Sequence, residues 1–569
     1  MSPCCSLRYF LFYLISGMTG SLLLLAGGSA LSKTSPVAQE IRFLLERDAS
    51  QTHPGFSHAP LHGKSHLLTF YSERAFEPAW SSGQQPTCEA MELRQLIRLA
   101  GIDGLLPEDY HLAAVNMLMN RFFETGLLSA GELALLDVLL SDAFVSFAHH
   151  LHHGKIHPEH LNGIWNIQTK RDEPRVLEKL NRALATKKVR EELHSLRPKF
   201  PVYDRMRASM KKYAELAKRY PDQNQPLSTN DKPLEIGERN PIVPFIRERL
   251  ILWQDLNVYS IAPDDEDLYD RTLAMGVVSF QQRNGLQADG AIGRATLEAL
   301  NHNSETLMEK LAVNMERLRW LPDTTLQEFI LVNIAGYSMD FISKQDTLLH
   351  SNAIVGKSYR KTPVFNAAMS YLVFSPTWTI PPTILKNDVL PSVRKNSAYL
   401  AEKNMRVLDH SGNTIDPHTI NWEKISGPDF PYLIRQEPGP SNPLGSVKFM
   451  FPNEYDVYIH DTPSKELFYR EDRALSSGCI RIQKPYELAQ LLLNDQPLWT
   501  DERIRSAMQQ NQEQLVQLNR KIPVIILYLT CWTDSNRREN IRKDIYNRDA
   551  ELLKRMRRPL LENRSGSEN

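Results

Sequence analysis

The hydrophobic period of the chain changes near residue 327, and this change constrains the fold more than any other feature. Before it, apolar residues recur at helical spacing, as along residues 89–100, where they share one face. After it come short apolar runs rich in β-branched residues, such as 329–334, 371–374 and 522–529, each typical of a strand. The sequence therefore predicts an α+β multidomain protein that is helical first and β-rich last.

At 569 residues the chain is long enough for about three domains with buried cores. We expect a leader at 1–32, a helical scaffold domain at 33–240, a small three-helix module at 241–302, a connecting helix at 303–326, a β-rich domain at 327–534 and a basic tail at 535–569. The tail has ten Lys or Arg against six Asp or Glu, and we expect it to be solvated and partly helical, with contact to an anionic surface as the alternative. Inside the β-rich domain, about 376–445 is too long and too poor in strand pattern for a plain loop, which indicates an inserted functional segment.

The first 32 residues have the pattern of an export signal. Arg8 is the only charge before Lys33, and the apolar stretch 9–31 contains a small-residue site at 28–30. This pattern fits a cleaved signal peptide. The stretch is also long enough to stay as a membrane anchor. Both interpretations imply export, and the sequence does not choose between them.

Composition limits the classes of partner and of site. Lys plus Arg and Asp plus Glu number 67 each, so net charge favours neither nucleic acid nor an acidic polymer as partner. The five cysteines are Cys4, Cys5, Cys88, Cys479 and Cys531, and they include no CxxC pair and no set with metal-ligand spacing. A disulfide between Cys88 and Cys531 is conceivable in an oxidising compartment, but nothing in the sequence supports it.

The stretch 458–482 contains the residues with the clearest chemistry. His460 precedes Cys479, and an imidazole within reach is the usual device for activating a thiol. Gly478 would let a substrate carbonyl approach the backbone N–H groups of Gly478 and Cys479, which could stabilise an oxyanion. Arg481 adds positive charge that would favour a thiolate or bind a carboxylate. The alternative is a buried structural cysteine beside an unrelated histidine.

The motif His460-Asp461-Thr462 followed by Ser476-Ser477-Gly478-Cys479-Ile480-Arg481 resembles the catalytic signature of the L,D-transpeptidases with a YkuD-type domain. Residues 377–382, 444–449 and 542–546 resemble segments of the large periplasmic members. The resemblance implies that Cys479 is the acyl-accepting nucleophile and His460 its general base and acid. It also implies a β-rich catalytic domain with a mobile lid as its insert, and it requires no metal and no organic cofactor.

By this resemblance the donor is a tetrapeptide stem of peptidoglycan, which loses its terminal D-alanine as a 3→3 cross-link forms. The same resemblance implies acylation by carbapenems, an activity in the periplasm of a Gram-negative bacterium, and partners that are stem peptides and glycan. The sequence leaves open water or a protein lysine as acceptor, which would make the chain a carboxypeptidase or an attachment enzyme. A non-catalytic wall-binding scaffold is the alternative of another class.

Four further residues are candidates for contact with substrate, and each has a structural alternative. Trp378 opens the insert and could touch substrate or pack. Tyr458 shares a strand face with His460, so that its hydroxyl could line the cleft, or its ring could belong to the core. Ser477 is either a turn residue or a hydrogen-bond partner of substrate. Arg481 binds a carboxylate or, as we slightly prefer, braces its own loop.

Residues 280–296 contain the pattern FQ-x-x-NGL-x-x-DG-x-I-G-x-x-T, with glycines at turn positions. This pattern is similar to that of the small three-helix peptidoglycan-binding module, and a spacer that has lost sugar binding is the alternative. A polar, proline-containing linker is expected before it, at 222–240.

Six histidines crowd together at 149–160, which suggests metal. The segment has no HExxH pattern and ends at a turn around Gly154 and Pro158. We therefore interpret these histidines as packing and capping residues at the end of a helix.

Overall fold

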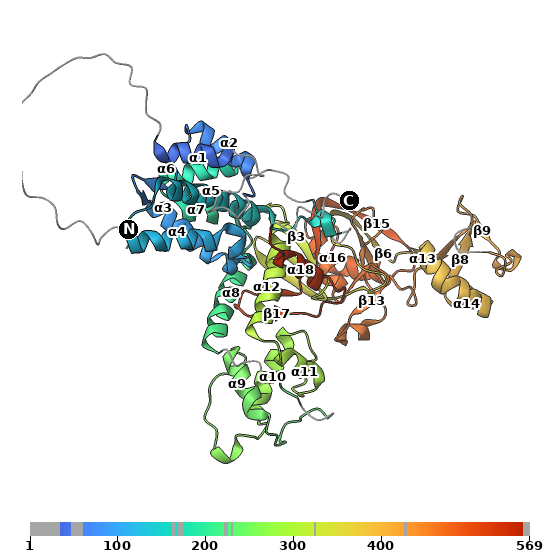
Figure 1. Ribbon diagram of the computed structural model, residues 1–569. Coiled ribbons are helices and arrows are strands. Elements are labelled where there is room, and N and C mark those ends of the chain that lie inside the picture. Colours follow the sequence, from blue (N-terminus) through green and yellow to red (C-terminus); the bar gives the residue numbers. More distant parts are fainter. Residues whose placement is uncertain are drawn as a thin grey trace, which may run out of the picture. The chain divides into compact units, whose positions relative to one another are not determined.

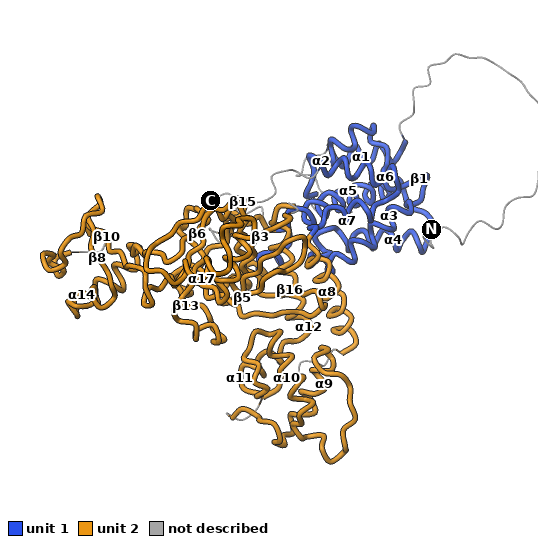
Figure 2. Tube along the Cα trace, turned by 180° about the vertical axis from the view of Figure 1, so that it is seen from behind, with its two compact units in different colours: residues 1–155, 170–199, 554–569 blue, residues 156–169, 200–553 orange. Residues whose placement is uncertain are grey.

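The computed structural model describes residues 35–46, 61–161, 165–168, 175–220, 226–228, 232–323, 326–425 and 430–560. The expected leader at 1–32 lies outside these ranges. Within them, no helix combines the length and the apolar character needed to cross a bilayer. The chain divides into two compact units, residues 1–155, 170–199 and 554–569 in one and residues 156–169 and 200–553 in the other (Figure 2).

The first unit is a helical bundle. Its helices are α1 (Pro36–Glu46), α2 (Lys64–Glu73), α3 (Cys88–Arg98), α4 (Leu112–Thr125), α5 (Ala130–His153), α6 (Val176–Thr186) and α7 (Val189–His194), with the short strands β1 (Ser81–Ser82) and β2 (Gln85–Pro86). α5 is buried along most of its length and forms the centre of the core. As predicted, Thr87 caps α3, and Ser129 with Glu132 forms a capping box at the start of α5.

The second unit contains a helix that we had placed in the scaffold. α8 (Pro201–Arg219) packs on the connecting helix α12 (Ser304–Arg319) of this unit. The Tyr213 hydroxyl donates to Glu539 at 3.0 Å, and Arg319 donates to the Tyr203 hydroxyl at 3.2 Å. The residues joined by these buried contacts lie far apart in the sequence, so the helical pattern alone did not show that α8 packs within this unit.

The three-helix module consists of α9 (Val243–Leu252), α10 (Arg271–Arg283) and α11 (Arg294–Leu300). Gln281 is 1% exposed, and its amide nitrogen donates to Asp289, the Ala291 carbonyl and Thr296, while its amide oxygen accepts from Gly290. Several residues of the recognised pattern therefore hold the module together internally, whether or not the module binds glycan.

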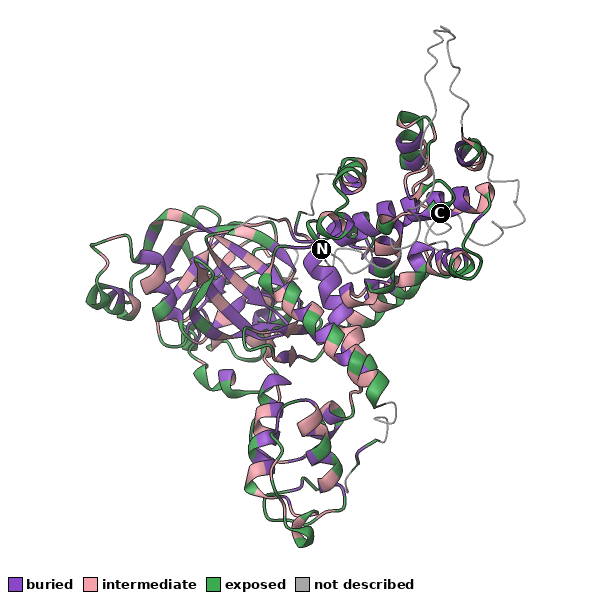
Figure 3. Ribbon diagram, turned by 90° about the vertical axis from the view of Figure 1, so that its left-hand side faces the viewer, coloured by how far each residue is buried: buried purple, intermediate pink, exposed green. Residues whose placement is uncertain are grey.

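A nine-stranded sheet dominates the rest of the unit (Figure 1). Its strands are β3 (Glu328–Asn333), β4 (Ser338–Ser343), β5 (Asp346–Gly356), β6 (Phe365–Phe374), β11 (Val447–Met450), β12 (Ile459–His460), β13 (Ala474–Ser476), β14 (Ile480–Ile482) and β15 (Gln514–Leu527). Their order is β13-β5-β14-β12-β11-β6-β15-β3-β4, and an additional pairing of β4 with β5 closes the sheet on itself. Buried residues line these strands (Figure 3), and the helices of this region are α16 (Pro485–Leu493), α17 (Asp501–Gln509) and α18 (Asp549–Arg557).

The insert is a folded element in its own right, although its sequence has little strand pattern. It contains the strands β7 (Trp378–Thr379), β8 (Met405–Leu408), β9 (Thr414–Ile415) and β10 (Leu433–Gln436), the helices α13 (Pro382–Ile384), α14 (Leu390–Lys395) and α15 (Tyr399–Glu402), and a π-helical turn at Leu385–Val389. The strands form a separate sheet in the order β7-β10-β8-β9, over a small core that includes Val407 and Ile434. Strands of two to four residues carry too little periodicity to be recognised from sequence.

The C-terminal segment contains the helix α18, in agreement with the partly helical tail we expected, but it is less solvated than expected. β17 (Glu539–Ile541) pairs with β16 (Cys531–Thr533), and Tyr546 is 3% exposed. The basic residues misled the sequence argument because several pair with protein groups: Arg538 contacts the Asp255 carboxylate at 2.6 Å, and Arg542 donates to the Arg283 carbonyl at 2.7 Å.

Candidate active site

The sheet brings the two predicted catalytic residues onto neighbouring strands. β12 and β14 run parallel, with His460 opposite Arg481, and Cys479 directly precedes β14. The Cys479 thiol donates to the Asp456 carbonyl at 3.7 Å, and no hydrogen bond joins it to His460 within the described part of the chain. Hydrogen bonds of this kind are often long without substrate and tighten when it binds.

A backbone carbonyl orients the imidazole. His460 is 4% exposed, and its Nδ1 lies 2.5 Å from the Asp461 carbonyl oxygen, so Nδ1 donates and Nε2 is left as the basic nitrogen. The Asp461 carboxylate is held in turn, because it accepts from the Ser446 N–H at 2.9 Å and from the Ser446 hydroxyl at 2.7 Å and pairs with Lys465. Gly445 has φ +61°, and a Cβ there would lie 2.5 Å from the Asp461 carboxylate. The segment 444–449, which the sequence marked only as a motif, thus holds Asp461, and Asp461 in turn orients His460.

Burial sets the protonation state of the pair. It lowers the pKa of His460 to about 3, with the charge of Arg481 acting in the same direction. It raises the pKa of Cys479 to about 11, although hydrogen bonds with Tyr458 and the charge of Arg481 oppose the rise. At neutral pH the pair is a thiol and a neutral imidazole. Arg481 therefore does not produce the resting thiolate that its place in the sequence suggested.

Cys479 follows a tightly held turn. Gly478 has φ +125°, a conformation that residues with a side chain rarely adopt. The Ser476 hydroxyl donates to the Cys479 carbonyl at 2.6 Å and accepts from the Gly478 N–H at 3.1 Å. We expected the N–H groups of both Gly478 and Cys479 to face an oxyanion, but that of Gly478 is engaged. The Cys479 N–H has no partner among the described residues and remains as the donor.

Tyr458 and Trp378 meet beside the sulfur. The rings of Tyr458, which directly precedes β12, and His460 lie 5.6 Å apart between centroids. The Tyr458 hydroxyl has the Cys479 sulfur and the Trp378 side chain as hydrogen-bond neighbours, and burial raises the pKa of Tyr458 well above its usual value. Trp378 is half-buried and also packs against the core of the insert. It therefore has a packing contact and a contact with the site at the same time.

The structure adds Arg360, which sequence reasoning missed, to the residues around the turn. Arg360 lies between β5 and β6, and its Nη1 donates to the Ser477 hydroxyl at 2.9 Å. The same nitrogen is 3.2 Å from the carboxylate of Asp388, a residue of the insert. No motif marks Arg360, because its partners lie far from it in the sequence.

Arg481 is largely buried beside Cys479, and among the described residues no hydrogen bond holds its guanidinium to the loop. Its Nε is buried without a hydrogen-bond partner, and within the described ranges its guanidinium has no ion pair. Desolvation lowers the pKa of Arg481, while the neighbouring Cys479 and Tyr458 raise it. The structure therefore gives no hydrogen bond in support of the bracing role that we preferred, and bracing and carboxylate binding both stay predictions.

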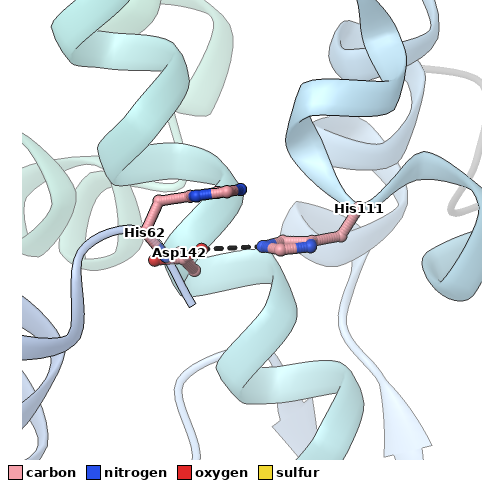
Figure 4. A group of neighbouring side chains, drawn as sticks. All are labelled: His62, His111 and Asp142. Atoms are coloured by element: carbon pink, nitrogen blue, oxygen red, sulfur yellow. Dashed lines mark hydrogen bonds and ion pairs between the residues drawn. The ribbon is translucent and has the colours of Figure 1, made fainter. Parts of the chain in front are cut away.

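Among the described residues, one group of three side chains is close enough to hold a metal ion: His62, His111 and Asp142, in the helical scaffold (Figure 4). Asp142 accepts from the N–H groups of His62 and Gly63 at 3.0 and 2.7 Å, and His111 Nε2 lies 2.7 Å from its Oδ2. The two histidine rings stack with planes 10° apart, so their in-plane lone pairs do not converge on one point. These donors fit a structural role at the start of α2 better than a metal site.

The crowded histidines predicted to pack do make packing contacts. The rings of His149 and His153 lie 4.8 Å apart, and His150 Nδ1 is 2.9 Å from the Tyr110 hydroxyl. Cys88 is exposed and Cys531 buried, and both are free thiols.

The sequence matches three family descriptions: "Scaffold domain" at 65–210, "Putative peptidoglycan binding domain" at 243–300 and "L,D-transpeptidase catalytic domain" (YkuD) at 327–509. A curated relative from Haemophilus influenzae, named "Putative L,D-transpeptidase", is 35% identical over 272 residues. That match covers 47% of this chain and 54% of the relative, so the chain spans about half the length of the relative it matches.

Two crystal structures are also similar to the chain. The L,D-transpeptidase of Xylanimonas cellulosilytica is 14% identical at a TM-score of 0.18 and is covered completely by 53% of this chain. That of Stackebrandtia nassauensis is 11% identical at a TM-score of 0.22, with 97% of it covered by 53% of this chain. Scores this low carry no weight for the fold. The family matches and the curated relative lead to the conclusion that this protein contains an L,D-transpeptidase catalytic domain of the YkuD type together with a peptidoglycan-binding domain.

Proposed function

We propose that the protein joins peptidoglycan stem peptides by 3→3 cross-links through an acyl-enzyme on Cys479. The observation that carries this proposal is the pairing of β12 with β14, which places the strand of the oriented, neutral His460 next to the strand that Cys479 precedes; among the described residues the Cys479 N–H has no partner. A nucleophile, a base and an oxyanion donor are the three parts that acyl transfer requires.

In the first half-reaction the Cys479 sulfur attacks the carbonyl of the third residue of a tetrapeptide stem. His460 Nε2 takes the thiol proton as the carbon–sulfur bond forms, and the oxyanion accepts from the Cys479 N–H. The carbon–nitrogen bond then breaks, and the D-alanine amine leaves with the proton from His460. The product is a thioester, with no change in oxidation state.

In the second half-reaction the side-chain amine of a third-position diamino acid, on another stem, attacks the thioester. His460 takes a proton from this amine, the amide bond forms and the carbon–sulfur bond breaks. The Cys479 sulfur recovers the proton as a thiol. Water in place of this amine would hydrolyse the thioester and give a carboxypeptidase, and a protein lysine would give an attachment enzyme.

We assign the substrate contacts to residues around the sulfur. The unpaired Arg481 guanidinium suits a stem carboxylate. The aromatic side chains of Trp378 and Tyr458 lie beside the sulfur, where they could pack against substrate. Ser477, in the same turn as Cys479, is exposed and could bond with it. The insert, which contributes Trp378, would act as the lid.

The proposed setting is outside the cytoplasm, in the periplasm of a Gram-negative bacterium, where the polymer is found. The peptidoglycan-binding domain supports glycan as a second partner. The segment 1–32 would direct export, and cleavage or retention as an inner-membrane anchor stays a prediction.

Mass spectrometry of the purified protein incubated with disaccharide-tetrapeptide tests this function. Wild-type protein should release D-alanine and form a dimer linked between third residues, and Cys479→Ala should do neither. Release without a dimer would replace the proposal by a carboxypeptidase. Equal behaviour of both proteins would leave a wall-binding scaffold. Acylation of wild type, but not of Cys479→Ala, by a carbapenem would report the active thiol independently.

A further inference from the structure

The carbonyl of Gly478, next to the nucleophile, is held by a residue that no motif marks. Thr362 is fully buried, and its hydroxyl donates to the Gly478 carbonyl oxygen at 2.7 Å. The same hydroxyl accepts from the Gly356 N–H at 2.9 Å. Both hydrogen-bonding roles of the hydroxyl are thus used, and its direction is fixed.

The position of Thr362 is set by the C-terminal segment. Tyr546 accepts from the Thr362 N–H at 3.1 Å and donates to the Gly356 carbonyl at 2.6 Å through the same hydroxyl. The Tyr546 N–H donates to the Tyr528 hydroxyl at 2.9 Å, which itself donates to Asp544 at 2.5 Å. This chain of buried hydrogen bonds starts in the segment 542–546, which the sequence marked as a motif without a role.

The loop between Gly356 and Thr362 passes so close to Gly356 that residue 356 has no room for a side chain. A Cβ at Gly356 would lie 2.1 Å from the Arg360 carbonyl oxygen and 2.8 Å from the Thr362 nitrogen. The loop from Gly356 to Thr362 therefore folds back on itself, with Tyr546 closing it from the other side. A side chain at Gly356 would therefore displace Thr362 and Tyr546 together.

The geometry points to a function for this brace: Thr362 and Tyr546 are positioning residues that aim the oxyanion donor. In a trans peptide the C=O and the N–H point in opposite directions within one plane. The Gly478 carbonyl and the Cys479 N–H belong to the same peptide unit. A hydrogen bond that anchors this carbonyl therefore directs the N–H away from Thr362, and no other group in the described part of the chain accepts from that N–H.

The inference rests on the proposed acyl transfer but goes beyond it, because neither residue touches the thiol or the base. Without the Thr362 hydroxyl, the glycine at 478 is free to rotate its peptide, since glycine has few steric limits. The oxyanion would then lose its preorganised donor, although the sulfur and His460 would stay in place.

Two reactions of Cys479 separate this role from a general loss of structure. Acylation by p-nitrophenyl acetate passes through an oxyanion and releases nitrophenol as the thioester forms. Alkylation by iodoacetamide displaces iodide from carbon and forms no oxyanion. Both are measured on the full chain for Thr362→Val, Thr362→Ser and Tyr546→Phe. The control Thr530→Val removes a fully buried hydroxyl that likewise donates once, to Asp549, and accepts once, from Asn314, but contacts no residue of the turn.

We expect Thr362→Val to slow acylation by about 10- to 100-fold, less than the roughly 100- to 1,000-fold cost of removing an oxyanion donor, because the N–H is misdirected and not removed. Its alkylation rate should be unchanged. Tyr546→Phe should slow acylation by about 3- to 10-fold, because it acts one residue further away. Thr362→Ser and Thr530→Val should leave both rates at the wild-type level.

Acylation of Thr362→Val at the wild-type rate would overturn the proposal, and so would an equal loss of acylation and alkylation. If Thr362→Val does not fold, Tyr546→Phe decides by the same comparison, since it keeps the ring and removes only the hydroxyl. Wild-type protein that reacts with the ester but never releases D-alanine from a tetrapeptide would refute the proposed substrate and leave the brace testable with the ester.

Discussion

The face of the sheet that carries His460 and the insert meet at the turn of Cys479 but are built on opposite principles. On the catalytic face, His460 is buried, its carbonyl partner is held through Asp461, and Gly478 has its N–H and its carbonyl both engaged. The insert has its own small sheet and core, and it reaches the turn through partly exposed residues such as Trp378 and Asp388. The difference teaches that the groups around Cys479 are held by buried hydrogen bonds of a closed sheet, whereas the insert has a core of its own and meets that turn through a few side chains.

The largest effect should come from the base. His460→Gln should lower the rate of D-alanine release by about 10³-fold, because general base catalysis is lost while the buried volume is nearly kept. Rates on disaccharide-tetrapeptide, with thermal unfolding as a check on folding, measure this. More than a tenth of the wild-type rate would mean that another group deprotonates the thiol.

The burial of His460 also predicts a pH dependence of stability. Its pKa falls from 6.5 to about 3 on folding, so between these values the unfolded state binds more protons than the folded state. The free energy of unfolding should therefore decrease as pH falls from about 6.5 toward about 3. Urea titrations at several pH values should show a smaller decrease for His460→Gln than for wild type. Parallel curves would mean that the imidazole is solvated.

Two glycine substitutions compare the regions directly. Gly445→Ala would place its Cβ 2.5 Å from the Asp461 carboxylate, and the resulting shift of His460 should cost about 10- to 100-fold in rate. Gly412→Ala, in the insert, carries the same left-handed strain at φ +89° but has no atom within 4 Å of its Cβ. It should destabilise by about 1–2 kcal/mol and keep the rate. Equal loss of rate in both would show that strain, and not the aim of the base, is responsible.

Removing one buried side chain from the core of the insert and one from the core of the nine-stranded sheet tests whether the insert folds separately. Ile434→Ala in the insert and Ile330→Ala in β3 remove side chains that are 1% and 0% exposed. Each should cost about 2–5 kcal/mol. Hydrogen exchange should show lost protection confined to about 376–445 for Ile434→Ala and spread over the sheet for Ile330→Ala. Spreading in both cases would contradict a separate insert.

The smallest effect should come from the link between the regions. Arg360→Gln breaks the contacts with Ser477 and Asp388, and Asp388→Asn breaks only the second. The free energy of unfolding should change by less than about 1 kcal/mol, because Asp388 is largely solvated. KM should rise by about 2- to 5-fold in each variant, and the double variant should resemble Arg360→Gln. Additive effects would mean that the two residues act independently.

Local patterns in the sequence were sufficient where the signal lies within a few residues. The caps at Thr87 and Ser129, the helix that starts at Pro485 and the strand around 329–334 were predicted and are confirmed. Short strands in the insert, the place of α8 and the packing of the C-terminal segment were not, because the contacts that define them join residues far apart in the chain.

The sequence by itself determined the residue types that the chemistry needs: a thiol after a glycine, an upstream histidine, and an arginine two positions beyond the thiol. Only the tertiary structure decided how these groups are used. Burial outweighs the charge of Arg481 and keeps the thiol neutral, and the Ser476 hydroxyl takes one of the two expected oxyanion donors. The anchoring of the Gly478 carbonyl by Thr362 links positions 116 residues apart. Desolvation and hydrogen-bond direction depend on neighbours brought together by folding, and a one-dimensional pattern does not specify them.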